Sequence, residues 1–161
     1  MNKFRKVAVG GTFDELHKGH RHLLVKAFEI GEKVLIGLCT DEFVKKMGKP
    51  HMTAPYEVRL KELQTFLEKS IVSDKANKAE IIPLSDPYGN TLTDRCIEAL
   101  VVSEETEKIA MKINQKRSEA QLPPLEIITI SMVPAENYKP ISTSRIRKGE
   151  IDREGHLLTN P

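Results

Sequence analysis

Residues 10–20 read GGTFDELHKGH and separate two segments of different type. The run Val7-Ala8-Val9 before them is typical of a buried β-strand, and the spacing of apolar residues over 23–30 is typical of a helix. A strand that passes through a glycine turn into a helix predicts a binding site at the carboxyl edge of a parallel sheet. A helix N-terminus attracts anions, and His17 and His20 add hydrogen-bond donors there. The stretch therefore predicts a phosphate site.

Zinc is the main alternative use of these histidines, with His22 as a third possible ligand. No cysteine or pair of carboxylates stands beside them at ligand spacing, so we favour phosphate and expect no metal held by protein side chains. The run also differs from the P-loop pattern G-x-x-x-x-G-K-[ST] and from the dinucleotide pattern G-x-G-x-x-G. The sequence therefore excludes these two nucleotide-binding signatures.

The chain has 161 residues, 39% hydrophobic and 30% charged, which suits one domain over residues 1–153 with a loose tail over 154–161. Its net charge is only +2, so we expect neither nucleic acid nor a membrane as the main partner. Cys39 and Cys96 match no zinc spacing and are expected to be buried thiols in a reducing compartment. No apolar run has the length of a membrane span or signal peptide, so the expected location is the cytoplasm; the oligomeric state stays open.

Apolar β-type runs alternate with amphipathic stretches along the chain. The expected strands are residues 5–10, 34–38, 79–84, 99–102 and 125–130. The expected helices are residues 19–31, 42–47, 55–69, 104–119 and 141–148, with a short helix from about Asp94. Strands that are apolar on both faces and separated by helices indicate a parallel sheet covered on both sides. We therefore expect an α/β, Rossmann-like fold with five parallel strands in the order 3-2-1-4-5 and a ligand site between strands 1 and 4.

Three hydroxyl residues, Ser142, Thr143 and Ser144, precede a short basic helix after the last strand. Hydroxyls, main-chain N–H groups and the guanidinium of Arg147 together suit a polyphosphate. An ordinary helix cap explains one hydroxyl but not three in succession. Because this helix follows the fifth strand, we expect it beside the histidine turn.

Lysines follow the second strand in the run KKMGKP, residues 45–50. A lysine on a Gly-Pro loop at the carboxyl edge of the sheet can bridge two phosphates. Lys49 is the best placed, and Lys46 is the alternative.

Two further loops follow strands 3 and 4 of the expected sheet. Residues 85–91, SDPYGNT, have turn composition and are either a surface turn or a substrate loop. Ser103 and Glu104 suit a helix cap, and in this fold the same place also reaches a nucleotide. Asn114 and Arg117 stand one turn apart on the helix that follows and are expected to face the same crevice.

Two motifs, HKGH at residues 17–20 and ISTSRIR at 141–147, resemble those of cytidylyltransferase-like nucleotidyltransferases. Residues 85–94, the run VVSEET at 101–106 and the Asn-x-x-Arg spacing at 114–117 are similar to the archaeal and eukaryotic branch of the phosphopantetheine adenylyltransferases. The resemblance implies transfer of the adenylyl group of ATP to 4′-phosphopantetheine. That reaction belongs to coenzyme A biosynthesis and gives dephospho-CoA and pyrophosphate, with Mg²⁺ carried in by ATP.

The resemblance also implies a role for each matching residue. The residues expected to be catalytic are His17, His20, Lys49 and Arg147. Those expected to bind ATP are Gly10, Gly11, Thr12, Phe13, Ser103, Glu104, Ser142, Thr143 and Ser144. Those expected to bind the acceptor are Thr12, Lys49, Asp86 and Tyr88.

Spacing alone does not choose the acceptor or the base. The first alternative is a related enzyme such as a FAD synthetase, with FMN as acceptor, or a glycerol-3-phosphate cytidylyltransferase, with CTP as donor. A nucleotide-binding sensor without catalysis and a zinc-binding protein are alternatives of other classes. The favoured reaction brings two anions together, so it needs positioning and charge stabilisation and no general base.

Overall fold

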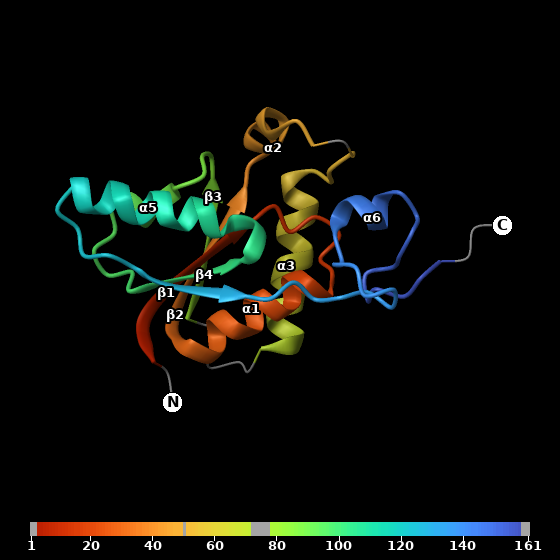
Figure 1. Cartoon of the computed structure of the whole chain (residues 1–161), viewed down its shortest axis with the longest axis horizontal. Helices are drawn as coiled ribbons and strands as arrows, with labels where there is room; N and C mark the ends of the chain where they lie inside the picture. The colour runs from red at the N-terminus through yellow and green to blue at the C-terminus, as the bar shows by residue number, and fades with distance from the viewer. Residues whose placement is uncertain (1–2, 50, 72–77, 159–161) are drawn as a thin grey trace.

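The computed structural model describes residues 3–49, 51–71 and 78–158. Five parallel strands form one sheet in the order β3-β2-β1-β4-β5, which confirms the predicted order (Figure 1). The strands are β1 (Phe4–Gly11), β2 (Gly31–Cys39), β3 (Ala79–Leu84), β4 (Ala99–Ser103) and β5 (Glu126–Ile130). The carboxyl ends of all five therefore meet at one edge of the sheet, where the loops that carry the motifs begin.

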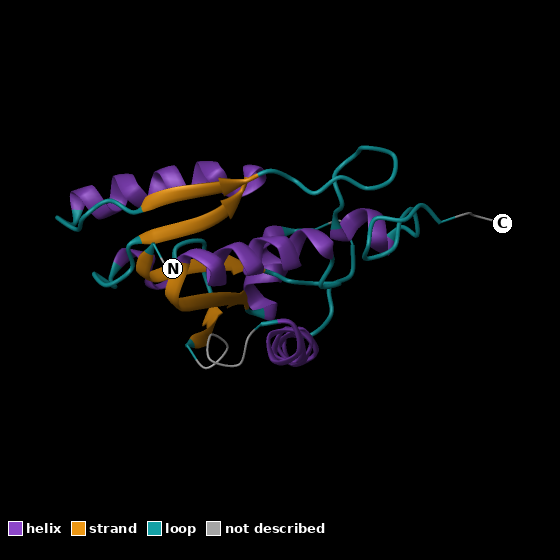
Figure 2. Cartoon of the chain, turned by 90° about the horizontal axis from the view of Figure 1, so that it is seen from below, coloured by secondary structure: helices purple, strands orange, loops and turns teal. Residues whose placement is uncertain are grey.

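Helices cover both faces of the sheet, as predicted. They are α1 (Lys18–Ile30), α2 (Asp41–Met47), α3 (Tyr56–Ser70), α5 (Glu107–Glu119) and α6 (Thr143–Arg147), with 3₁₀ turns η1 (Gly89–Leu92) and η2 (Glu104–Thr106). Figure 2 shows strands between α5 on one side and α3 on the other. Alternate residues of the strands point to opposite faces, and each set is buried by its own helices.

Two cores result from this alternation. One face of the sheet packs against α1 and α3, and its buried side chains include Val7, Val9, Val34, Ile36, Val101, Leu24, Phe28 and Leu63. The other face packs against α5, and its buried side chains include Ala8, Leu35, Leu100, Val102, Ala110 and Ile113. Strands buried on both sides explain why the sequence shows continuous apolar runs rather than alternation.

The structure corrects three local predictions. The helix expected from Asp94 is absent, because the Asp94 carboxylate accepts a hydrogen bond of 2.8 Å from the amide of Cys96 and competes with helical bonding. The 3₁₀ turn η1 lies inside the segment expected to be loop. Cys96 is exposed rather than buried.

The chain beyond Val133 forms a small core of its own, beside the carboxyl edge of the sheet (Figure 1). Ala135, Ile141 and Ile151 are buried in it. A loose tail was predicted from residue 154, but the amide of Glu136 donates to the Gly155 carbonyl at 2.9 Å, and the amide of Leu158 donates onward to Glu150. These long-range bonds attach the tail as far as Leu158, while residues 159–161 lie outside the described part of the chain.

Candidate active site

The sheet opens between β1 and β4 at its carboxyl edge. Pairing of these strands ends at Ala8↔Leu100, although β1 continues to Gly11 and β4 to Ser103. A cavity of about 640 Å³ occupies the opening. This volume is within the usual range for small-molecule sites, and the position is the predicted switch point between strands 1 and 4.

Most of the predicted site residues line this one cavity. They are Gly10, Gly11, Thr12, Phe13, His17, His20, Lys49, Tyr88, Ser103, Ser142, Thr143 and Ser144. The structure thus brings imidazoles from the start of the chain and hydroxyls from its end to the same space. Asp86, Glu104 and Arg147 are not among the lining residues.

The cavity also has an apolar part, on the α5 face of the sheet. Its walls there include Ala8, Leu35, Ile82, Leu100, Ala110 and Ile113. The loop after β3 contributes Pro87, Tyr88, Gly89, Asn90 and Thr91 to the lining. The cavity therefore joins a polar region, rich in hydrogen-bond donors, to a region suited to an uncharged chain.

His17 and His20 cap the start of α1 with their side chains. The Nδ1 atom of His17 accepts hydrogen bonds from the amides of Gly19 at 3.0 Å and His20 at 3.3 Å. The Nδ1 atom of His20 accepts one from the amide of His17 at 3.2 Å. The two rings stack with their centroids 3.6 Å apart. An accepting Nδ1 leaves the proton of a neutral imidazole on Nε2, so each ring presents Nε2–H as its donor.

Both rings are held in the neutral form. Burial, followed by the positive charges of Arg21 and Arg153, lowers the pKa of His17 from 6.5 to about 4. Burial is also the largest cause that holds the pKa of His20 well below its usual value, followed by neighbouring His17. At neutral pH the pair therefore consists of uncharged donors.

Gly19 is required by this arrangement because the His17 ring lies against its Cα. A Cβ atom at this position would lie 2.9 Å from Cε1 and 3.1 Å from Nδ1 of His17. The glycine between the histidines therefore leaves room for the capping ring, a close approach that the motif spacing alone does not reveal.

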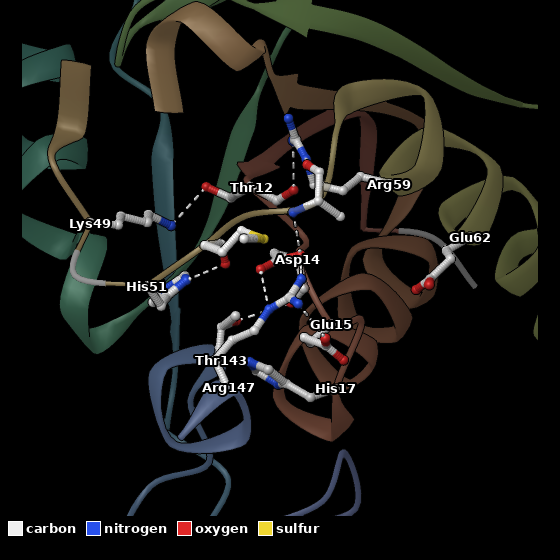
Figure 3. Close-up of polar contacts among 12 residues, drawn as sticks. Thr12, Asp14, Glu15, His17, Lys49, His51, Arg59, Glu62, Thr143 and Arg147 are labelled. Atoms are coloured by element: carbon white, nitrogen blue, oxygen red, sulfur yellow. Dashed lines mark hydrogen bonds and ion pairs between the residues drawn. The ribbon is translucent and has the colours of Figure 1, made fainter. Parts of the chain in front are cut away.

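Lys49 is the lysine that reaches the cavity. Its Nζ donates to Thr12 Oγ1 at 2.9 Å, and burial lowers its pKa (Figure 3). Lys46 lies exposed on α2 and is not among the lining residues. The structure thus places Lys49, and not Lys46, beside the turn that follows β1.

Arg59 is a site-organising residue that sequence reasoning missed. Its side chain on α3 is 1% exposed and donates to the carbonyls of Thr12 at 3.0 Å and Cys39 at 2.7 Å. It also donates to the carbonyl of Ala54 and pairs with Asp41 at 2.9 Å. Arg59 thereby ties together the loops after β1 and β2. A signal was present, because this arginine precedes Leu63 and Leu67 at a spacing of four on the apolar helix face.

Asp14 connects the β1 turn to α6. Its carboxylate is 1% exposed and accepts from Arg147 Nη2 at 2.8 Å and from the amide of Ala54 at 3.2 Å. Its carbonyl accepts from Thr143 Oγ1 at 3.0 Å (Figure 3). Arg147 also pairs with Glu15 at 3.2 Å. Arg147, predicted to be catalytic, is thus placed where it joins the two ends of the chain at the edge of the cavity.

The turn that carries Asp14 has an unusual backbone. Phe13 has a φ of 51° and Glu15 a φ of 54°, in the left-handed region that such residues rarely adopt. The Phe13 side chain is buried, and its ring meets that of His20 edge-on with the centroids 5.4 Å apart. Strain of this kind persists where surrounding contacts compensate for it, and it often accompanies functional sites.

The other predicted residues have local structural roles. Ser142 caps α6 by accepting from the amide of Arg145 at 3.3 Å. Asp86 accepts from the amides of Tyr88 and Gly89, both at 2.8 Å, and so shapes the loop after β3. Glu104 accepts from the amide of Met132, while its neighbour Glu105 lines the cavity.

Asn114 and Arg117 do not face the cavity, contrary to the expectation from their spacing. Asn114 bonds to both main-chain groups of Leu125, at 2.7 and 2.9 Å. Arg117 is fully buried and donates to main-chain carbonyls. Burial of this helix face against β5 and the preceding loop turns both side chains away from the opening.

The part of the chain that the structure describes offers no group of three or more His, Cys, Asp or Glu side chains that could hold a metal. Nor does a helix within the described ranges have the length and apolar character needed to cross a membrane. The donors of the cavity are imidazoles, a lysine and hydroxyls, which suit an anion better than a hard cation.

Comparisons with known proteins agree with this geometry. The cytidylyltransferase-like family matches residues 8–149. A protein of Methanothermobacter thermautotrophicus named phosphopantetheine adenylyltransferase is 48% identical over 97% of this chain and 91% of its own length. A protein of Pyrococcus abyssi with the same name is 47% identical over 98% of both chains.

Two solved structures are similar in fold. One, described as a protein with unknown function from Archaeoglobus fulgidus, has a TM-score of 0.69 at 33% identity and covers 78% of this chain and 88% of its own. The other is a bifunctional NMN adenylyltransferase/ADP ribose pyrophosphatase from Francisella tularensis, with a TM-score of 0.62 at 15% identity. It covers 98% of this chain and 46% of its own, and the likeness shows the fold alone.

The Asp14–Arg147 pair predicts a coupled loss of stability. Asp14→Asn leaves a buried oxygen acceptor but removes the charge, so we expect the free energy of unfolding in urea to fall by about 1–3 kcal/mol. Arg147→Met should lower it as well, and the double variant should lose clearly less than the sum of the two. Strictly additive losses would show that the two side chains do not stabilise each other.

The capping geometry predicts the protonation state of the two histidines. In ¹⁵N spectra of the imidazoles at pH 7, His17 and His20 should both be neutral with the proton on Nε2. His17 should stay neutral as the pH falls through 6 and begin to charge only near its lowered pKa of about 4. A midpoint close to 6.5, or an Nδ1–H tautomer, would contradict the arrangement.

Proposed function

The chain belongs to the cytidylyltransferase-like family, and on that premise we propose how its cavity transfers the adenylyl group of ATP to 4′-phosphopantetheine. The products are dephospho-CoA and pyrophosphate. The observation that carries the proposal is the convergence of His17, His20, Lys49 and the hydroxyls of residues 142–144 on one cavity. A triphosphate needs donors along its whole length, and these elements supply them from both ends of the chain.

The reaction is a displacement at the α-phosphorus of ATP. An oxygen of the acceptor phosphate forms the new bond to that phosphorus, and the bond to the β-phosphate oxygen breaks with its electron pair going to pyrophosphate. The acceptor is already an anion, so no base has to remove a proton from it. The protein has to overcome repulsion between two anions and stabilise charge on the leaving group.

The two imidazoles suit this task in their neutral form. Their Nε2–H groups donate to phosphate oxygens, with His20 nearest the α-phosphate. Because Nδ1 of each ring is occupied by a main-chain amide, the rings are held in position before the substrate arrives. Preorganised donors of this kind need no reorganisation as charge develops in the transition state.

Lys49 supplies the positive charge between the two substrates. It lies against Thr12, at the turn after β1, and we assign it to bridge the acceptor phosphate and the α-phosphate. Burial lowers its pKa, and the approach of two phosphate anions would favour its charged form again. Thr12 then lies near the acceptor phosphate.

The hydroxyls at the start of α6 are assigned to the β- and γ-phosphates. Ser142, Thr143 and Ser144 line the cavity, and main-chain N–H groups at this helix start add donors. Arg147 adds positive charge on the same side, although Asp14 and Glu15 neutralise part of it. Its contact with the departing phosphates would require a partial exchange of these partners.

The remaining assignments follow the family resemblance. We assign Gly10, Gly11 and Phe13 to contacts along the nucleotide, and Ser103 with Glu104 to the adenosine, although Glu104 itself is not among the lining residues. The apolar part under the loop of Asp86 and Tyr88 is assigned to the pantetheine arm, which carries no charge beyond its phosphate. We also propose a cytoplasmic location, on the two free cysteines and the metabolic substrates.

Magnesium enters this scheme with the substrate. The polar lining residues are mostly hydroxyl groups and imidazoles with one lysine, and Glu105 is the one carboxylate among the lining residues that the structure describes, so these side chains do not fit a resident Mg²⁺ ion. We propose that ATP brings the ion, bound by its phosphates and water. The protein groups act on the phosphate oxygens that remain free.

A substrate panel tests the proposed function. ATP and CTP are each incubated with 4′-phosphopantetheine, FMN or glycerol 3-phosphate in the presence of Mg²⁺, and pyrophosphate release is measured. We expect turnover only with ATP and 4′-phosphopantetheine. Faster turnover with CTP or another acceptor would overturn the assignment. Tight ATP binding with no release would indicate a sensor, and stoichiometric zinc after purification would indicate a metal protein.

The role of His20 is tested by His20→Ala. Loss of one oriented donor should lower kcat roughly 10²- to 10³-fold while the fold persists. His156→Ala is the matched control, because His156 is an exposed histidine outside the cavity lining. Turnover of His20→Ala near that of the control would remove His20 from the mechanism.

A further inference from the structure

Arg117 is a buried cation that the mechanism does not use. It lies in the last turn of α5 and is 0% exposed. Its Nε donates to the Pro123 carbonyl at 2.7 Å, and its Nη1 donates to the carbonyls of Thr91 at 2.6 Å and Asp94 at 3.2 Å. Its Nη2 is buried without a hydrogen-bond partner among the described residues. Burying a guanidinium in this way is costly, and an apolar side chain would fill the same volume without that cost.

Two of the three carbonyls that Arg117 holds, those of Thr91 and Asp94, belong to the loop that closes the apolar part of the cavity. The amide of Thr91 in turn donates to the Tyr88 carbonyl at 3.1 Å, so the contact of Arg117 with Thr91 is passed on to Tyr88. Tyr88, Asn90 and Thr91 all line the cavity, whereas Arg117 does not. Arg117 therefore positions the lining residues without facing the cavity itself.

A second contact from α5 holds the same loop. The Nζ of Lys116 lies 5.2 Å from the centre of the Tyr88 ring, within the range of a cation–π interaction. Lys116 and Arg117 are adjacent on the helix, so one turn of α5 holds both the backbone and the aromatic ring of the loop. Arg59 acts comparably from α3 on the other face of the sheet, where it holds the carbonyls of Thr12 and Cys39.

We propose that Arg117 is a positioning residue for acceptor affinity: it holds residues 88–94 in the conformation that completes the apolar part of the cavity. This inference rests on the proposed function, since it assigns that part to the acceptor and not to ATP. The nucleotide phosphates lie at the other end of the cavity, with His17, His20 and the start of α6. Loosening the loop should therefore weaken acceptor binding and leave ATP binding nearly unchanged.

The test compares KM values for the two substrates. In Arg117→Met, KM for 4′-phosphopantetheine should rise roughly 10- to 100-fold, the factor for losing one charge-assisted hydrogen bond, while KM for ATP changes less than about twofold. Arg117→Lys keeps the charge but not the three-way contact, so its rise should be smaller. A purely structural role would lower stability, or both affinities together, without separating the two substrates.

Lys116→Met tests the same loop through an exposed residue that does not threaten folding. It should raise KM for 4′-phosphopantetheine by a few-fold, and Lys112→Met is its control because Lys112 is exposed one turn earlier on the same helix. If Arg117→Met does not fold, Arg117→Lys and Lys116→Met decide the question. The proposal would be overturned if the KM values for ATP and for 4′-phosphopantetheine changed equally. It would also be overturned if Lys116→Met and its control Lys112→Met had equal effects.

Failure of the proposed function gives a different result. The wild-type panel is run first, and it identifies the acceptor independently of any change at Arg117. If wild type turns over 4′-phosphopantetheine but Arg117→Met and Lys116→Met leave its KM unchanged, only the role of Arg117 is wrong. If wild type does not use 4′-phosphopantetheine, the proposed function and the acceptor affinity assigned to Arg117 are both wrong.

Discussion

The buried carboxylate of Asp14 joins the two ends of the chain at the cavity. It accepts hydrogen bonds from Arg147 on α6 and from the amide of Ala54 before α3, while its carbonyl accepts from Thr143. An unpaired buried carboxylate would be strongly unfavourable, so the guanidinium stabilises the turn in this conformation. Phe13 and Glu15, on either side of Asp14, have positive φ angles, and the contacts of Asp14 help to compensate for that strain.

The opening of the sheet between β1 and β4 explains why the site lies where it does. Crossovers leave β1 and β4 toward opposite faces of the sheet, so no helix fills the space between their carboxyl ends. Buried arginines hold the loops around this opening from opposite faces of the sheet: Arg59 on α3 holds those after β1 and β2, and Arg117 on α5 holds the one after β3. Each donates to several main-chain carbonyls, which a lysine of the same charge cannot do with comparable geometry.

Local patterns predicted the sheet well and the loops less well. The apolar runs indicated all five strands, because strands buried on both faces are apolar throughout. Their order was predicted from the rule for right-handed crossovers in a Rossmann-like sheet, and the structure has the same order. The helix expected from Asp94 failed because a side-chain hydrogen bond to the amide of Cys96 replaced helical bonding. The attachment of the tail to residues 136 and 150 was not predicted either. It consists of main-chain hydrogen bonds between short polar segments, and such segments have no hydrophobic periodicity from which the contacts could be inferred.

The residue order between 10 and 20 was sufficient to indicate a phosphate site, because a strand, a glycine turn and a histidine-capped helix are local features. The pairing of Asp14 with Arg147 spans 133 positions and depends on the folded sheet edge. The same holds for the choice of Lys49 over Lys46 and for the neutral state of the histidines, which comes from burial. The sequence shows which residues able to bind phosphate are present, because that is a property of neighbouring positions. Where these residues meet, how they are oriented and whether they are charged depends on contacts between residues far apart in the chain.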